Sequence, residues 1–170
     1  MEREIWVTDF TIRDAVESDV PALVALINCA YRVEDFFKSA DRTDPADVRS
    51  LMNRGRFLLL EDDRNLAGSV FVQLDGARGY FGMLSIDPAR QNQGLGARLV
   101  VAAEDTCRRS GCTEMELQVV SLRIELLEYY RRFGYVECGT RPFPEPQHLT
   151  QPCHCILMRK DLHARITPHR

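Results

Sequence analysis

Hydrophobic residues follow two different periods along this chain, and the alternation between them predicts the order of its elements. A period of about four residues marks the longest helix, expected over 95–110, whose apolar face carries Leu95, Leu99, Ala103 and Cys107. Glu104 and Arg108 fall between these positions, so we expect both to face solvent. Further helices are expected over 19–31, 47–54 and 124–133, and strands over 10–13, 57–61, 66–73, 80–86, 115–120, 135–138 and 154–159.

This order of elements predicts the fold class. Strands and helices alternate only in the second half of the chain, which favours a mixed sheet in an α/β or α+β domain over a regular doubly wound one. A chain of 170 residues is long enough for one domain with a substantial core, so we expect a single domain over 1–170.

Charge and hydropathy narrow the classes of partner. The formal net charge is -3, and the short basic clusters are typical of solvated helix faces, so we expect neither nucleic acid nor a membrane as a partner. No run approaches the roughly 20 apolar residues that cross a bilayer, and the first residues carry no apolar signal-peptide core. We therefore expect a cytoplasmic protein.

The six cysteines do not predict a metal site. Their spacing matches neither a zinc ribbon nor a CxxC redox motif. Cys153, His154 and Cys155 lie together, but no second pair of ligands stands at zinc-finger spacing. A strand with small apolar thiols is the simpler interpretation, and we expect no metal.

The segment between the strand at 80–86 and the long helix carries the candidate chemistry. Gly94 and Gly96 stand where that helix begins. The first N–H groups of a helix have no intrahelical acceptor and form an anion site, and glycine lets a phosphate approach the main chain. We therefore expect residues 91–97 to hold a pyrophosphate.

Two other interpretations of the glycine pair were weighed against this one. A flexible turn into a helix would need no ligand, and the glycines alone do not rule it out. A dinucleotide-binding turn, G-x-G-x-x-G/A, would place Leu99 at its third small position and would need Glu116, in mid-strand, as its ribose ligand. The dinucleotide interpretation is therefore rejected.

Two motifs resemble those of a known family. Gln91-Asn92-Gln93-Gly94-Leu95-Gly96 resembles the Q/R-x-x-G-x-G/A signature of the GNAT acetyltransferases. The stretch from Tyr129 to Tyr135 resembles the family's aromatic pair followed by a Gly-aromatic step. The resemblance spans about residues 10–160. It implies a mixed, mostly antiparallel sheet of about seven strands, flanked by helices and splayed between the fourth and fifth strands.

The resemblance implies a site for acetyl-CoA as co-substrate. The pantetheine arm would lie in the splay and pair with the main chain of the fourth strand, as an added strand does. Arg123 stands where many relatives have an asparagine that contacts the cofactor; it would reach CoA or the acceptor, or be simply exposed. The expected main-chain contacts are Leu84, Ser85 and Ile86, and the expected pyrophosphate contacts are Gln91, Asn92, Gln93, Gly94, Gly96 and Ala97.

The resemblance also assigns catalytic roles. Tyr130 would donate a hydrogen bond or a proton to the departing CoA sulfur; packing in the helix interior is the alternative. Tyr129 should point elsewhere, because adjacent helical residues do not share a face. An amine of pKa about 10.4 is almost wholly protonated at pH 7, which is equivalent to about 4–5 kcal/mol of barrier. A base is therefore expected, and Glu116 and Glu61 are the candidates.

The acceptor side is expected in two segments, which could also be ordinary surface loops. Tyr31 ends the first helix and Arg32, Glu34 and Phe37 follow it, whereas Arg141 follows the sixth strand. Arg32 or Arg141 would suit a small carboxylated amine, and a protein amine stays open.

Together these features predict an acetyl-CoA-dependent N-acetyltransferase. It would move an acetyl group to a primary amine of a small molecule or a protein, by direct attack in a ternary complex. The alternative is a non-catalytic CoA-binding module. Because dimers are common in the superfamily, a homodimer is also considered.

Overall fold

The computed structural model describes residues 9–63 and 65–163, and within them a seven-stranded mixed sheet forms the centre of the molecule. The strand order is β1-β2-β3-β4-β5-β7-β6. Neighbouring strands are antiparallel except β4 and β5, which are parallel. The predicted mixed, mostly antiparallel sheet is therefore confirmed. The strands are β1 (Thr11–Asp14), β2 (Arg56–Glu61), β3 (Leu66–Asp75), β4 (Arg78–Ile86), β5 (Glu114–Val120), β6 (Val136–Pro142) and β7 (His154–Asp161).

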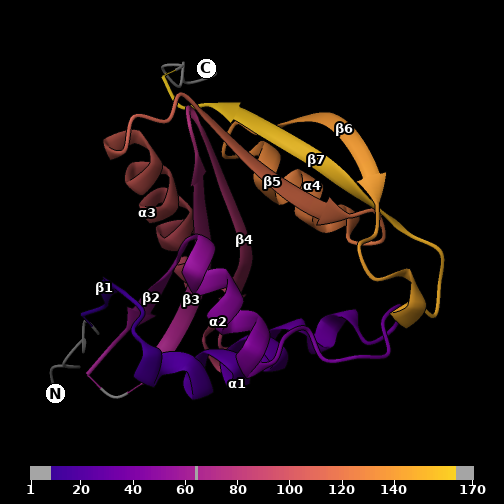
Figure 1. Ribbon diagram of the computed structural model, residues 1–170, viewed down its shortest axis with the longest axis horizontal. Helices are drawn as coiled ribbons and strands as arrows, with labels where there is room; N and C mark the ends of the chain where they lie inside the picture. The colour runs from indigo at the N-terminus through magenta and orange to yellow at the C-terminus, as the bar shows by residue number, and fades with distance from the viewer. Residues whose placement is uncertain (1–8, 64, 164–170) are drawn as a thin grey trace, which may run out of the picture.

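Within the same residues, four α-helices cover the two faces of the sheet (Figure 1). α3 and α4 share one buried cluster with the sheet, and α1 and α2 share the other. In β2, Leu58 and Leu60 belong to the first cluster, whereas Phe57 and Leu59 belong to the second. This strand is apolar from Phe57 to Leu60 because both of its faces are buried there. The helices are α1 (Val20–Tyr31), α2 (Pro45–Arg54), α3 (Leu95–Arg109) and α4 (Ile124–Arg131).

β4 and β5 pair only where they begin. Residues 78–80 of β4 pair with residues 114–116 of β5, and beyond them the two strands diverge into a V (Figure 1). The sides of β4 and β5 that face this V have no strand partner among the described residues, since β3 and β7 pair with their opposite sides. A β-bulge and a positive φ of 51° at Met83 interrupt the regular pairing of β4 with β3. The predicted splay between the fourth and fifth strands is confirmed.

Two loops meet across the open end of the V. The chain between α1 and α2 and the chain between β6 and β7 form a β-bridge at Lys38 and Leu149. The backbone N–H of Ser39 also donates to the carbonyl of His148 at 2.9 Å. These contacts tie the arm that contains β1–β4 to the arm that contains β5–β7.

The prediction that Glu104 faces solvent is wrong. Glu104 is 3% exposed, and its carboxylate accepts hydrogen bonds from Lys160 Nζ and from Tyr135 Oη, each at 2.9 Å. Lys160 lies on β7, far from α3 in the sequence. The burial of this glutamate therefore depends on a distant partner that the local pattern of α3 cannot show.

The sixth strand is longer than its sequence indicates. We expected it to end at residue 138, whereas β6 continues to Pro142. Arg141 therefore lies in a strand, opposite Cys155 of β7, instead of in the following loop. β6 is an edge strand with exposed residues along its whole length, so it lacks the alternation that identifies a half-buried strand.

Candidate active site

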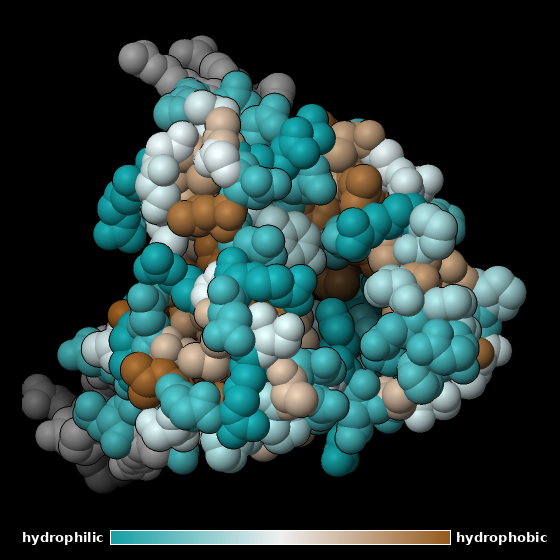
Figure 2. All heavy atoms as spheres, in the orientation of Figure 1, coloured by the Kyte–Doolittle hydropathy of each residue, from teal (hydrophilic) through white to brown (hydrophobic). Residues whose placement is uncertain are grey.

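A cleft of about 730 Å³ occupies the V between β4 and β5. Its walls are β4 and the start of α3 on one arm, and β5 and α4 on the other. Figure 2 shows a hollow between the two arms with apolar residues in its floor. Residues of the two bridging loops, including Glu34 and Phe143, line its other end. The cleft is thus bounded by a helix N-terminus at one end and by loops at the other.

The helix end of the cleft is built for an anion. Gly94 is the N-cap of α3 with a φ of 77°, and the helix's first hydrogen bond runs from the N–H of Arg98 to the carbonyl of Gly94 at 3.2 Å. The preceding N–H groups, those of residues 95–97, therefore have no acceptor within the helix. Of the expected pyrophosphate contacts, all but the exposed Gln93 line the cleft: Gln91, Asn92, Gly94, Gly96 and Ala97.

The edge of β4 presents alternate residues to the cleft. Leu84 and Ile86 line it, whereas Ser85 is 1% exposed and its hydroxyl donates to the carbonyl of Met83 at 3.0 Å. Ser85 can therefore contribute through its main chain but not through its side chain. A strand edge that lacks a partner strand offers N–H and C=O groups to an extended ligand.

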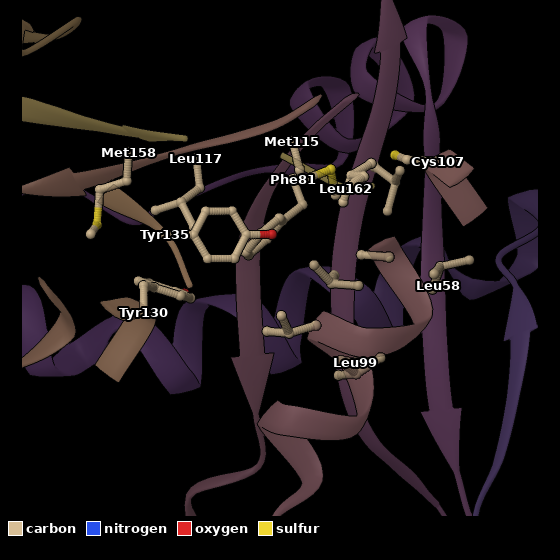
Figure 3. Packing of buried hydrophobic residues seen from close by; sticks show 14 of the residues in the cluster. Leu58, Phe81, Leu99, Cys107, Met115, Leu117, Tyr130, Tyr135, Met158 and Leu162 are labelled. Carbon is tan, nitrogen blue, oxygen red and sulfur yellow. The ribbon is translucent and has the colours of Figure 1, made fainter. Parts of the chain in front are cut away.

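Tyr129 and Tyr130 both line the cleft from α4. The ring of Tyr130 packs edge-on against Phe81 at 5.8 Å and against Tyr129 at 5.2 Å, and Figure 3 shows it close to Tyr135. The prediction that Tyr129 points elsewhere is wrong. Leu126 also lines the cleft, and residues three and four positions after it share its face of the helix.

The Tyr130 hydroxyl is available to a ligand. It donates a hydrogen bond to none of the described residues, although the side chain is only 7% exposed and lines the cleft. Burial raises the pKa of this phenol well above its usual range. Tyr130 is therefore a neutral hydrogen-bond donor throughout the physiological pH range.

Arg123 joins the two arms through Glu34. Arg123 Nη1 donates to Glu34 Oε1 at 3.1 Å, and the two side chains are 13% and 9% exposed. Arg123 pairs with Glu125 as well, so the alternative that Arg123 is simply exposed is wrong. Burial raises the pKa of Glu34, against the opposing effects of Arg42, Arg123 and Lys38. Sequence reasoning placed Glu34 on the acceptor side but did not identify it as a candidate base, because a glutamate in a polar loop carries no local sign of burial.

Three residues that we expected at the site lie outside the cleft. Glu116 on β5 accepts a hydrogen bond from Arg159 of β7 at 3.2 Å, and Glu61 pairs with Arg13 at 2.8 Å. Neither candidate base therefore borders the cleft. Phe37 is fully buried, so it cannot form the exposed wall that was expected of it.

Two of the other expected acceptor residues lie around a smaller recess of about 270 Å³ beside the main cleft, whereas Arg141 is exposed on β6 and belongs to the lining of neither space. Tyr31 lines both spaces, and Arg32 lines the recess. Arg42, which the sequence did not single out, also lines both, and its guanidinium lies 5.1 Å from the centre of the Tyr31 ring.

Residues 9–63 and 65–163 contain neither a candidate metal cluster nor a candidate membrane helix. No group of three or more His, Cys, Asp or Glu side chains there is arranged to hold a metal ion. No helix in those ranges combines the length and the apolar character needed to cross a membrane.

The sequence matches one family model and several curated proteins. Residues 21–135 match the model described as the acetyltransferase (GNAT) family. A mycothiol acetyltransferase of Clavibacter sepedonicus is 34% identical over 136 residues, which cover 79% of this chain and 44% of that protein. The chain thus spans less than half the length of this relative. Acetyltransferase Atu2258 of Agrobacterium fabrum is 23% identical over 145 residues, which cover 84% of this chain and 95% of that protein.

Solved structures share the fold at low sequence identity. The ribosomal-protein-S18-alanine N-acetyltransferase from Escherichia coli superimposes with a TM-score of 0.73 at 19% identity, covering 95% of this chain and 100% of that one. The structure of yncA from Salmonella typhimurium with its cofactor acetyl-CoA gives a TM-score of 0.69 at 21% identity, covering 95% and 99%.

Proposed function

This chain belongs to the acetyltransferase (GNAT) family, and on that premise we propose that it is an acetyl-CoA-dependent N-acetyltransferase acting on a primary amine. The observation that carries the proposal is the cleft between the unpaired edges of β4 and β5, which ends at the free N–H groups of α3. This arrangement fits an extended molecule with a diphosphate at one end.

The residues of the cleft fit acetyl-CoA, which supplies an activated thioester when bound. The N–H groups of Gly96 and Ala97 would bind the diphosphate together with the loop that carries Gln91 and Asn92. The edge at 84–86 would pair with the amides of the pantetheine arm. Gly96 also keeps space open, because a Cβ there would lie 3.0 Å from the Tyr129 hydroxyl.

Tyr130 would stabilise the leaving group. Its hydroxyl lines the cleft and has no acceptor among the described residues, and burial raises its pKa above that of a thiol. A phenol that is a weaker acid than the thiol it faces does not give up its proton fully. We therefore assign Tyr130 a strong hydrogen bond to the departing sulfur instead of complete proton transfer.

Glu34 is the carboxylate best placed to accept the proton of the amine. It lines the cleft and the recess, and burial raises the pKa of this carboxyl toward the range in which a general base works well near neutral pH. Arg123 holds the carboxylate in place and acts on the reaction through it, as a positioning residue.

Direct attack in a ternary complex is favoured over an acetylated cysteine. Cys155 lines the cleft, but burial raises the pKa of its thiol. The thiolate is the reactive nucleophile, so a thiol held protonated at neutral pH is a poor one. The acceptor amine would therefore attack the thioester itself.

A titration followed by a turnover assay tests this function. The purified chain would first be titrated with acetyl-CoA and then incubated with a panel of primary amines while free thiol is followed. We expect binding, and thiol release above background with at least one amine. Binding without release for every amine would instead identify a non-catalytic CoA-binding module, and absence of binding would reject both functions.

A further inference from the structure

Two arginines at the acceptor end of the cleft have no ion-pair partner among the described residues. Arg42 lies in the chain between α1 and α2, where its guanidinium stacks on the ring of Tyr31 at 5.1 Å. Arg141 lies near the end of β6, on the other arm of the molecule. By contrast, the neighbouring cations Lys38 and Arg123 are paired, with Glu145 at 3.1 Å and with Glu34 at 3.1 Å.

Arg42 lines the cleft, and Arg141, which is exposed, is the strand partner of Cys155, a residue that lines the cleft. Both lie close enough to Tyr80 and to Cys155 to lower the pKa of each, against the larger effect of burial. Tyr80 and Cys155 both line the cleft. Two positive charges that act on the same two residues repel each other, and an anion bound near both would offset this repulsion. Arg42 and Arg141 therefore prepare a place for an anionic group.

A proton acceptor stands beside this place. Arg42 has the largest electrostatic effect of the charged groups that act on Glu34, yet the hydrogen-bonded partner of Glu34 is Arg123. Arg42 is thus near Glu34 while its own donors are left for another acceptor. An ammonium group would meet the Glu34 carboxylate, and a carboxylate on the same molecule would meet the arginines.

The space around these groups suits a small molecule. The recess that adjoins the cleft measures about 270 Å³ and shares Tyr31, Glu34 and Arg42 with it. The two bridging loops meet over this end of the V through the Lys38–Leu149 bridge. A volume of this size lies at the lower end of the range for ligand pockets.

We propose that the acceptor is a small amine that carries a carboxylate, as an amino acid does, with the carboxylate held between Arg42 and Arg141 and the amine at Glu34. This inference rests on the proposed acetyltransferase function. The amine nitrogen forms a bond to the acetyl carbon while the bond from that carbon to sulfur breaks. The ammonium group loses two protons, one to Glu34 and one to solvent, and the departing thiolate, hydrogen-bonded by Tyr130, takes up one proton from solvent, so that an N-acetyl amino acid and free CoA thiol are the products.

The experiment compares matched acceptors that differ only in the carboxylate. The probes are the twenty common amino acids and their amides, together with a set of monoamines that carry no anionic group, each tested with acetyl-CoA by thiol release. We expect at least one amino acid to react with a kcat/KM about tenfold or more above that of its amide, because the charge-assisted hydrogen bonds to the arginines are lost in the amide.

Variants then test the two arginines. Arg42→Gln and Arg141→Gln should each lower the ratio of kcat/KM for the amino acid to kcat/KM for its amide about tenfold, since a neutral amide gains little from a positive charge and any change at Glu34 affects both acceptors alike. Arg54→Gln is the matched control, because Arg54 is exposed in the last turn of α2, outside the cleft. It should leave both acceptors unchanged.

Each contrary outcome has a distinct meaning. Equal use of acid and amide, or an equal loss for both in the arginine variants, would overturn the carboxylate site. Thiol release with monoamines but with no amino acid would also overturn it, while leaving the acetyltransferase function intact. Binding of acetyl-CoA with no thiol release for any probe would reject the enzyme function, and this inference with it.

Discussion

At the scale of single residues, Tyr130 gives the most specific chemical prediction. Its hydroxyl faces the cleft, and burial raises its pKa, so it is a permanent hydrogen-bond donor at neutral pH. We expect Tyr130→Phe to lower kcat about 100-fold, because the departing thiolate loses its donor. The Kd for CoA, measured by calorimetry, should stay within about twofold, since binding depends mainly on α3 and β4.

Tyr135→Phe is the matched control for that variant. The Tyr135 hydroxyl is also buried, but it donates to Glu104 at 2.9 Å and does not border the cleft. The control should lose about 1 kcal/mol of stability and keep its kcat. An equal fall of kcat in both variants would show that Tyr130 acts through packing instead of through its hydroxyl.

Glu34 should determine the acidic side of the pH profile. A base acts when deprotonated, and burial raises the pKa of Glu34 above its usual value while Arg42, Arg123 and Lys38 oppose the shift. The kcat/KM of the wild type should therefore fall as the pH drops through this raised pKa. Glu34→Gln should lower the kcat/KM about 100-fold and remove this fall at acidic pH. The measurement is the pH dependence of kcat/KM.

Glu125→Gln is the matched control for Glu34. Glu125 also pairs with Arg123, but its side chain is 59% exposed. Glu125→Gln should keep both the kcat/KM and its fall at acidic pH. It removes a contact with Arg123, as Glu34→Gln does, but leaves the Glu34 carboxylate in place. If the kcat/KM of Glu34→Gln still falls at acidic pH, the proton acceptor is another group.

Among single residues, the sequence identified those site residues that belong to a motif. Gly94, Gly96 and Tyr130 stand in motifs, and the structure brings them to one cleft. Arg42 and the role of Glu34 as a base were missed, because their importance comes from contacts between two arms that the sequence does not place together. Glu116 was chosen for its position on a strand, and its ion pair with Arg159 could not be foreseen.

At the scale of elements, the start of α3 is the feature on which cofactor binding depends. Gly94 lines the cleft with a φ of 77°, and an added Cβ would meet nothing within 4 Å. We expect Gly94→Ala to raise the Kd for CoA about tenfold and to cost about 1 kcal/mol of stability from its left-handed backbone.

Gly111→Ala separates these two effects. Gly111 follows the other end of α3, has a φ of 87° and likewise has nothing within 4 Å of an added Cβ. The variant should lose similar stability in urea unfolding and bind CoA as the wild type does. If both variants bind CoA equally well, the N-terminus of α3 is not the diphosphate site.

The contact between α3 and β7 sets a second prediction at this scale. Glu104 accepts from Lys160 at 2.9 Å, and Lys160 is itself 9% exposed. Glu104→Ala would leave a buried ammonium without its partner, so we expect a loss of about 3–5 kcal/mol in urea unfolding. Asp105→Ala, at a side chain that is 51% exposed, should change stability by about 0.5 kcal/mol or less. Equal effects would contradict the buried pair.

The elements themselves followed largely from periodicity. The order of helices and strands was predicted correctly, since amphipathic helices such as α3 and apolar strands such as β2 carry strong local patterns. The end of β6 was not, because an exposed edge strand is defined by its pairing with β7 and not by its own pattern.

At the scale of the whole molecule, the proposed function depends on a sheet in which β4 and β5 are paired over only part of their length. β4 and β5 share only three residue pairs before they separate, and the two arms are joined again at the far end by loops and by the Arg123–Glu34 pair. The splay was predicted through the family resemblance. Its loop bridges were not, since they join segments more than 100 residues apart, such as Ser39 and His148.

The most direct measurement is a crystal structure of the chain with CoA. The account predicts the diphosphate on the main-chain N–H groups of residues 91–97, the pantetheine amides along the open edge of β4, and the sulfur within hydrogen-bond distance of the Tyr130 hydroxyl. CoA bound elsewhere, or an extended arm that bypasses the edge of β4, would contradict it.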